Sequence, residues 1–325
     1  MAKLSASWAT RRYFWAIAEP LPTNRAFRLS EDARQMDFHQ KTLLSDEFGI
    51  GMAGLLMEQF LGAGSFVDIS VALNAPESYQ DIGREGSAQP DFLMWGEEEN
   101  SPYYIVECKG TQSNKSTSYD QLRRGLEQVP SVVFGAGARP VVTAVVATCL
   151  QDKSTDVFVL DPPPDAPEDD HPERESSERV SERTGGRTWQ IHNPEAFRKR
   201  AVIAEESNLL KWAGQYQTAA VRDQQLEARQ PPLMEMPNAQ LETKSTDFGN
   251  FRGIVQSLFP ELGIPKLTMF TGVEGDLLES LIQNAKRRDG GHMEVGQKKQ
   301  PLPLKHLPGT ASVSRSGTCM IIDGL

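Results

Sequence analysis

The sequence has few of the residues that hold small secreted proteins or zinc proteins together. Only three of its 325 residues are cysteines, and they form no CxxC pair, which argues against a disulfide framework and a structural zinc site. The five histidines show no HxH or HxxxH spacing, so the commonest signatures of catalytic zinc are missing. Any metal is therefore expected to bind through oxygen atoms.

Long apolar runs are also missing. No stretch approaches the roughly 18 consecutive apolar residues that predict a membrane span, and the opening residues, MAKLSASWATRRYFW, lack the apolar core of a secretory signal. We therefore expect a cytoplasmic protein with no membrane association. A chain of 325 residues with 38% hydrophobic content can form one large or two modest domains.

Positive charge is in short supply, since the formal net charge is −10. This balance opposes binding to nucleic acid, which gains affinity from Lys and Arg. The distribution weakens the objection, because residues 161–187 hold nine acids against four arginines and account for about half of the excess. The charge of the whole chain therefore does not exclude a nucleic-acid partner.

The pattern of apolar residues predicts an ordered series of helices and strands. Helical spacing predicts a helix over about 46–62, with Ser45 as its cap, and another over 117–129. β-branched and aromatic residues bounded by Gly, Pro, Asn or Ser predict strands at 65–74, 91–95, 103–109, 139–149 and 156–162. The predicted order is helix, three strands, helix, strand.

This order and the composition divide the chain into four parts. Residues 1–41 form an N-terminal extension, 42–162 an α/β domain, and 163–187 an acidic, Pro-rich flexible linker or loop. Residues 188–325 are predicted as a mostly helical C-terminal region with a basic tail, in which 193–230 forms one long helix or a helix pair.

A glycine pattern in the first predicted helix offers one reading of the α/β domain. Gly49, Gly51 and Gly54 satisfy GxGxxG, the fingerprint of dinucleotide-binding enzymes. That site requires a buried strand before the first glycine, so that the turn delivers the pyrophosphate to a helix N-terminus. The residues before Gly49 are the acidic SDEF instead. Glycines that allow close packing explain the pattern better.

A set of charges on two consecutive strands offers a second reading. Side chains alternate along a strand, so Glu107 and Lys109 share one face about 6.6 Å apart while Cys108 faces the core. If the 91–95 strand turns back into 103–109, Asp91 comes alongside Glu107. Two neighbouring acids repel each other unless a cation lies between them, and Mg²⁺ takes oxygen ligands of this kind.

These residues, in QPDF, YYIVECKGTQ and YDQLRRGLEQ, resemble the PD-(D/E)XK nuclease superfamily. The resemblance covers about residues 42–160 and implies a restriction-endonuclease-like core, a mixed central sheet flanked by helices. It also implies an enzyme, a metal-dependent deoxyribonuclease that hydrolyses phosphodiester bonds in DNA. Asp91 and Glu107 would hold Mg²⁺, for which Mn²⁺ can substitute, and Lys109 would assist the attacking water.

The resemblance extends to residues on both helices. Many members carry a helix Glu, for which Glu47 and Glu58 are both candidates, with Glu47 slightly favoured by its place at the helix start. Gln121 fits the place of a Gln in the second helix, and Gln128 follows seven residues later on the same face. Both glutamines are expected to support the site or bind the DNA backbone.

The resemblance also suggests a biological setting. Restriction, repair and phage-defence effectors are nucleases of this kind, and they often act beside an ATPase or helicase. A homo-oligomer is left open. The main alternative is a catalytically inactive subunit on the same fold that binds nucleic acid or protein, and a dinucleotide-binding enzyme is a remote third.

Overall fold

The computed structural model describes residues 16–17, 27–73, 82–84, 89–96, 101–135, 141–160, 189–226, 236–257, 268–287, 311–314 and 316–323. The chain forms two compact units. Unit 1 contains Met1–Ser70 and Tyr79–Glu195, and unit 2 contains Val71–Ser78 and Ala196–Leu325. The acidic segment predicted at 163–187 and most of the basic tail lie outside the described residues.

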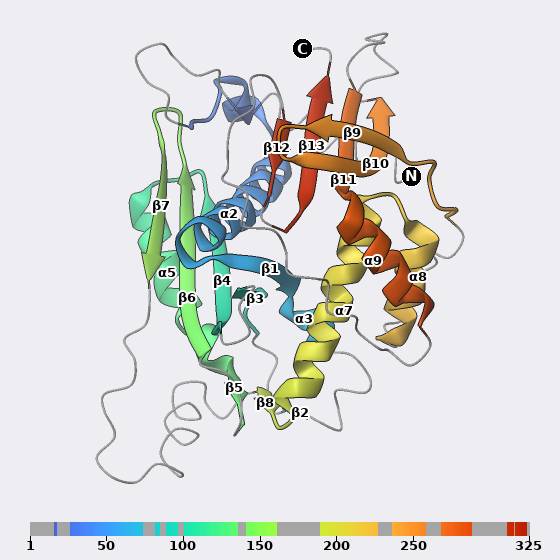
Figure 1. Ribbon diagram of the computed structural model, residues 1–325. Coiled ribbons are helices and arrows are strands. Elements are labelled where there is room, and N and C mark those ends of the chain that lie inside the picture. The colour runs from blue at the N-terminus through green and yellow to red at the C-terminus, as the bar shows by residue number, and fades with distance from the viewer. Residues whose placement is uncertain are drawn as a thin grey trace. The chain divides into compact units, whose positions relative to one another are not determined.

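A five-stranded mixed sheet forms the centre of unit 1 (Figure 1). Its strands, in spatial order, are β1 (Ala63–Asp68), β3 (Phe92–Gly96), β4 (Tyr103–Thr111), β6 (Val141–Leu150) and β7 (Thr155–Leu160). β4 and β6 run parallel, and every other neighbouring pair is antiparallel. β6 is buried along most of its length, as its almost continuous apolar sequence predicts for a central strand.

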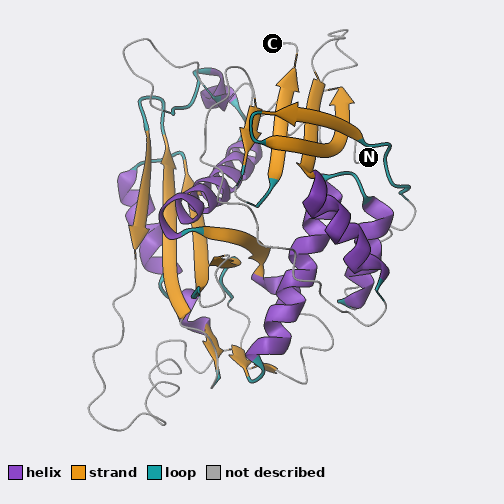
Figure 2. Ribbon diagram, viewed as in Figure 1, coloured by secondary structure: helices purple, strands orange, loops and turns teal. Residues whose placement is uncertain are grey.

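Helices cover both faces of this sheet (Figure 2). α2 (Phe38–Leu61) packs Ala53 and Met57 against the β4 face that carries Val106 and Cys108. α5 (Lys115–Gly125) lies on the other face, where Gly125 meets Val145 of β6. Unit 1 is therefore α/β, with a mixed sheet between helices, as the sequence predicted. For the central sheet and the two helices on its faces, the order of helix, three strands, helix and strand matches the predicted order, but the strand predicted at 65–74 ends at Asp68 and its second half forms a helix (Ile69–Leu73).

Shorter elements complete unit 1. They are the 3-10 helices η1 (Asp32–Gln35) and η2 (Val129–Ser131), helix α3 (Ile69–Leu73), which crosses into unit 2, and a small sheet of β2 (Ile82–Arg84), β8 (Trp189–Ile191) and β5 (Val132–Phe134). Leu29 and Ala33, in the predicted N-terminal extension, pack with Leu44 of α2 and Leu150 of β6.

Helix α2 begins eight residues before its predicted start. Asp37 is the N-cap, because its carboxylate accepts a hydrogen bond from the Gln40 N–H, and Ser45 lies inside the helix. The predicted cap at Ser45 is therefore wrong. Since Gly49 also lies within this helix and η1 precedes the helix, the strand that a dinucleotide fingerprint requires is not there.

The backbones of α2 and β4 approach each other closely where the two elements cross, beside the predicted acids. A Cβ added to Gly110 would lie 1.8 Å from the Ser45 carbonyl oxygen, and one added to Gly49 would lie 2.9 Å from the Lys109 carbonyl carbon. Only glycine fits these two positions without displacing backbone. The second to fourth turns of α2 are thereby held against the C-terminal end of β4.

Unit 2 combines helices with a second sheet. Its helices are α7 (Pro194–Trp212), α8 (Tyr216–Gln225) and α9 (Gly275–Lys286), and its five strands, in spatial order, are β12 (Ala311–Val313), β13 (Thr318–Asp323), β11 (Thr268–Glu274), β10 (Gly249–Ser257) and β9 (Glu242–Thr246). The prediction of a helix pair is confirmed by α7 and α8. The prediction of a mostly helical region missed the sheet.

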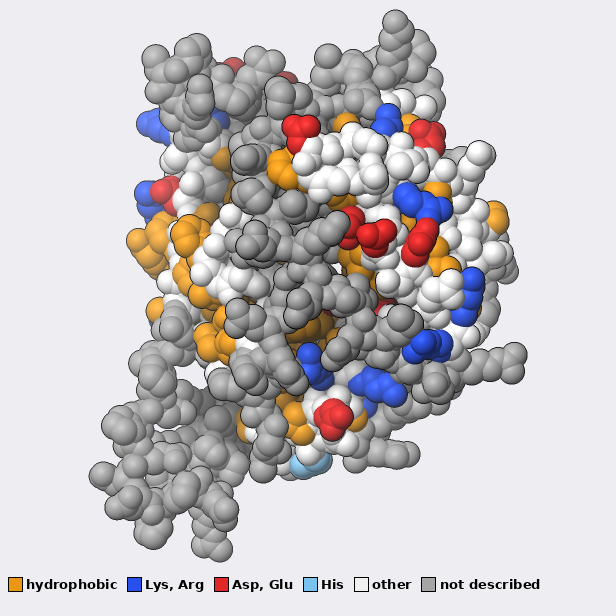
Figure 3. All heavy atoms as spheres, viewed as in Figure 1, with side chains coloured by type: hydrophobic (Ala, Val, Ile, Leu, Met, Phe, Trp, Pro, Cys, Tyr) orange, Lys and Arg blue, Asp and Glu red, His pale blue; other side chains and the backbone are white. Residues whose placement is uncertain are grey.

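The surface carries isolated apolar side chains as well as charges. Val157 and Val159 of the edge strand β7 are exposed, and hydrophobic side chains reach the surface over the side of unit 1 where β6 and β7 lie (Figure 3). Among the helices that the structure describes, none combines the length and the apolarity needed to cross a bilayer.

Candidate active site

The antiparallel pairing of β3 and β4 brings the two predicted acids together. Asp91 immediately precedes β3, whose first residue, Phe92, pairs with Val106 of β4. The Asp91 N–H donates to Glu107 Oε2 over 3.1 Å, and the Cys108 N–H donates to Asp91 Oδ2 over 2.8 Å. These reciprocal hydrogen bonds hold the carboxylates side by side, in the arrangement that the hairpin predicts.

Lys109 completes the group of charges on β4. Its ammonium forms an ion pair and hydrogen bond with Glu107 Oε1. The Glu107 side chain is fully buried, whereas 26% of the Lys109 side chain is exposed. Cys108, between them, contributes to the core under α2. The predicted division of this strand into a charged face and a core face is confirmed.

The pair of carboxylates carries more negative charge than Lys109 neutralises. Burial is the largest cause that raises the pKa of Glu107 from its ordinary value of 4.5 to about 7, and the charge of Asp91 raises it further, while Lys109 acts in the opposite direction. Desolvation and repulsion between carboxylates both favour the protonated acid. A cation placed between the two carboxylates would relieve both effects.

Helix α2 contributes a third acid, which the sequence did not identify. Burial raises the pKa of Asp46, the charge of Lys109 lowers it, and the charges of Asp91 and Glu47 raise it. Asp46 is thus within electrostatic range of the site through both Lys109 and Asp91. The sequence pointed to the next residue, Glu47, because the resemblance implies a glutamate at this place.

The structure also separates the two helix glutamates. Glu47 lies in the turn of α2 that meets β4, beside Asp46, and is half-buried. Glu58 lies nine residues beyond Gly49, which approaches the Lys109 backbone, and nine residues span about 13 Å along the helix axis. Glu58 is therefore too far along α2 to join the group at Lys109.

The two predicted glutamines hold the chain on either side of the acids. Gln121 Nε2 donates to the carbonyl oxygen of Gly110, directly after Lys109, over 3.2 Å. Gln128 Nε2 donates to the carbonyl oxygen of Gln89, two residues before Asp91, over 3.4 Å. Both side chains therefore fix backbone segments next to the site, which is a positioning role.

The donor chemistry of this site fits a hard divalent cation. Asp91 and Glu107 supply carboxylate oxygens, and Mg²⁺ commonly takes one or two protein carboxylates and keeps several waters. Across the described ranges, no three or more His, Cys, Asp or Glu side chains are arranged to hold a metal ion. At this site Asp91 and Glu107 would be the protein ligands, with water completing the coordination, and Lys109 would have to release Glu107 Oε1.

No protein-family model, curated protein or solved structure matches this chain. The geometry of the site itself is therefore the basis for its chemistry.

Proposed function

We propose that this protein is a Mg²⁺-dependent nuclease that hydrolyses phosphodiester bonds in DNA, built on a restriction-endonuclease-like core. One observation carries the proposal: Asp91 and Glu107 meet at adjacent strands with Lys109 on the same face as Glu107. The mixed sheet with parallel β4 and β6, between α2 and α5, supports the proposed core. A restriction, repair or defence effector acting beside an ATPase or helicase fits this activity.

Each residue of the site has a defined role in the proposal. Asp91 and Glu107 hold the metal, and Mg²⁺, when bound, polarises a phosphodiester oxygen and lowers the pKa of a water. Lys109 presents its ammonium to the charge that develops on the phosphoryl group. Asp46 adds negative charge near Lys109, and Gln121 fixes the backbone after it.

A second function is favoured by one feature of the same site. Glu107 has no exposed surface and already forms an ion pair with Lys109, which is what a purely structural pair would show. On that reading the chain is a catalytically inactive nuclease-fold subunit that binds nucleic acid or protein. The charge of Asp91 favours the enzyme, because a structural ion pair gains nothing from a second acid placed against the buried one.

Cleavage of plasmid DNA and of RNA by the purified full chain, with Mg²⁺ or Mn²⁺, tests the proposal. We expect metal-dependent DNA cleavage that falls at least about 100-fold in Glu107→Gln and in Lys109→Ala, because each loses charge stabilisation at the reacting phosphate. Glu242→Gln is the matched control, since Glu242 and Lys244 form the same ExK spacing on strand β9 in unit 2.

The outcomes separate the readings. Cleavage that persists in Glu107→Gln and Lys109→Ala overturns the site assignment. Metal-dependent binding of DNA without any cleavage, with or without an added helicase partner, favours the inactive subunit.

A further inference from the structure

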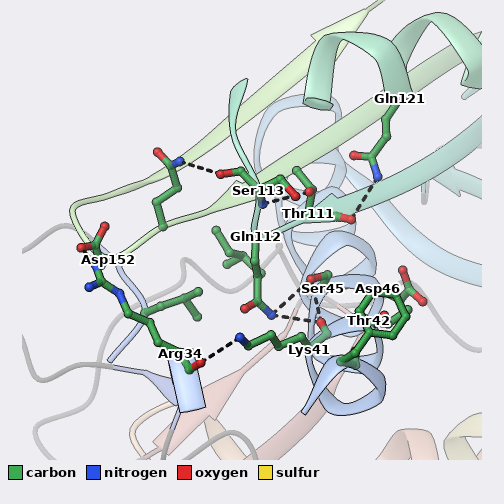
Figure 4. Close-up of a pocket in the computed structure, with 15 residues that line it drawn as sticks. Arg34, Lys41, Thr42, Ser45, Asp46, Thr111, Gln112, Ser113, Gln121 and Asp152 are labelled. Carbon is green, nitrogen blue, oxygen red and sulfur yellow. Dashed lines mark hydrogen bonds and ion pairs between the residues drawn. The ribbon is translucent and has the colours of Figure 1, made fainter. Parts of the chain in front are cut away.

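A pocket of about 640 Å³ lies beyond the C-terminal end of β4 (Figure 4). Its walls come from the first turns of α2, from residues 110–113 after β4, and from residues 150–152 at the turn between β6 and β7. All of these segments belong to unit 1. Pockets of this size bind small molecules or single residues of a polymer.

The pocket lies next to the proposed active site, although Asp91, Glu107 and Lys109 do not line it. Asp46 lines it and is also in electrostatic range of Asp91 and Lys109, and Gly110 lines it directly after Lys109. Gln121 belongs to the same wall. Its Nε2 is occupied by the Gly110 carbonyl, whereas its Oε1 is buried without a hydrogen-bond partner in the described structure.

Hydrogen bonds between the chain segments that line the pocket hold its wall in place without a ligand. Gln112 Nε2 donates to the Lys41 carbonyl over 3.0 Å and to Ser45 Oγ over 3.3 Å, which joins β4 to α2 (Figure 4). Gln151 Nε2 donates to the Ser113 carbonyl over 3.3 Å, which joins the turn after β6 to the same segment. The cavity therefore does not depend on closure around a ligand.

The lining suits a heterocyclic base. Amide and hydroxyl groups predominate, and the two cations, Arg34 and Lys41, are balanced by the two acids, Asp46 and Asp152. Phe38 also lines the pocket, and its side chain is 78% exposed, so its ring lies at the open rim. An exposed ring beside amide groups provides both a stacking surface and hydrogen bonds for base edges.

We propose that this pocket receives one unpaired nucleotide of the DNA strand being cut, with its base stacked on Phe38. The inference rests on the proposed function, because the strand must continue from the pocket to Asp91 and Glu107. A base inside an intact duplex cannot enter such a cavity without leaving its stack. The preferred substrate is therefore a single strand or a frayed end, and continuous duplex is disfavoured.

Binding of a short labelled single-stranded DNA in metal-free buffer tests this inference independently of cleavage. Phe38→Ala is expected to weaken single-strand binding by about 5- to 150-fold, the loss of about 1–3 kcal/mol of stacking on one base. Phe38→Trp is expected to preserve it. Phe60→Ala is the matched control, because Phe60 is 79% exposed on the same helix and does not line the pocket.

Blunt duplex and deoxyadenosine monophosphate are the other two arms. Equal losses in Phe38→Ala and Phe60→Ala, or blunt duplex binding as tightly as the single strand, would overturn the inference. Deoxyadenosine monophosphate that binds more tightly than the oligonucleotide would assign the pocket to free nucleotides and overturn it too. If Phe38-dependent binding is found but no metal supports cleavage, the pocket is a single-strand binding site and the proposed nuclease function fails.

Discussion

Each unit of this protein buries a glutamate beside a cation, and the two arrangements differ in their balance. In unit 2, the buried Glu206 forms an ion pair with Arg222 and accepts a hydrogen bond from Asn284 Nδ2 over 2.9 Å. In unit 1, Glu107 forms an ion pair with Lys109 but also lies against the second acid Asp91. Donors surround Glu206, whereas Glu107 shares its site with like charge.

The exposure of the cation differs in the same sense. Only 1% of the Arg222 side chain is exposed, and its guanidinium also donates a hydrogen bond to Gln225 Oε1. This cation therefore cannot reach solvent unless the helices separate. Lys109 is 26% exposed and can turn away from Glu107. The Glu206–Arg222 pair is therefore closed and holds α7, α8 and α9 together. The Glu107–Lys109 pair is open, and Glu107 can accept another cation in place of Lys109.

The strongest test of this comparison removes each glutamate charge in turn. Glu206→Gln replaces one acceptor oxygen with an amide donor that must face Arg222 or Asn284, and we expect it to lower the free energy of unfolding by about 3–5 kcal/mol. Glu107→Gln also removes the repulsion with Asp91, so its expected effect is within about 1 kcal/mol. Urea denaturation gives the magnitudes, and hydrogen exchange assigns them to each unit.

Equal destabilisation by the two variants would show that Glu107 and Lys109 form a structural pair like that of unit 2. It would then remove the main argument that separates the enzyme from the inactive subunit.

The pH dependence of stability sharpens the comparison next. The pKa of Glu107 is raised to about 7 in the folded chain, so the folded state binds a proton more tightly than the unfolded state does. The contribution of protonated Glu107 to the free energy of unfolding is therefore fully present below about pH 4.5 and is lost as pH rises through about 7. At 1.36 kcal/mol for each unit of pKa shift, the loss is about 3 kcal/mol. Hydrogen exchange of β3 and β4 peptides in metal-free buffer measures this loss.

Two variants control for other titrating groups. Glu107→Gln should abolish most of the loss, and Asp91→Asn should reduce it, because the charge of Asp91 is the second cause of the raised pKa. A loss that is unchanged in Glu107→Gln would mean that another group titrates.

The sequence was sufficient for the strand residues of the site because their placement depends on local periodicity. Alternation along β4 alone separates Glu107 and Lys109 from Cys108, and the apolar runs on either side predict the hairpin that aligns Asp91. The antiparallel register confirms that alignment. Neither conclusion required knowledge of distant contacts.

Features that depend on contacts with other elements were not predictable in the same way. Asp46 faces the site only because Gly110 and Gly49 allow α2 to cross β4 at that turn, and Asp37 caps the helix outside the predicted range. In unit 2, β10 pairs with β9 and β11, so its sequence gains strand structure from partners that the local pattern does not name. Packing between distant segments decided the position of Asp46, and pairing with the neighbouring strands decided the structure of β10.

The choice of helix acid is the next prediction. Asp46→Asn is expected to lower DNA cleavage by about 10- to 100-fold, the size of effect seen when a residue that orients a metal site is lost. Glu47→Gln should have a smaller effect, and Glu58→Gln serves as the control on the same helix. Cleavage rates of the three variants at saturating Mg²⁺ measure these effects. A larger loss in Glu58→Gln than in Asp46→Asn would contradict the placement of the site where α2 crosses β4.

Binding of Mg²⁺ to the folded chain is the smallest expected effect and bears directly on the open pair. At about 10-fold above its dissociation constant, the ion should stabilise unit 1 by about 1.4 kcal/mol, and the gain should disappear in Asp91→Asn and in Glu107→Gln. Because Mg²⁺ competes with the proton on Glu107, the gain should grow as pH rises through about 7. Thermal unfolding with and without Mg²⁺ measures it, with Glu242→Gln as the control. If Mg²⁺ still stabilised both site variants, the ion would bind elsewhere. Lys109 would then be the cation that pairs with Glu107 in the presence of Mg²⁺ as well.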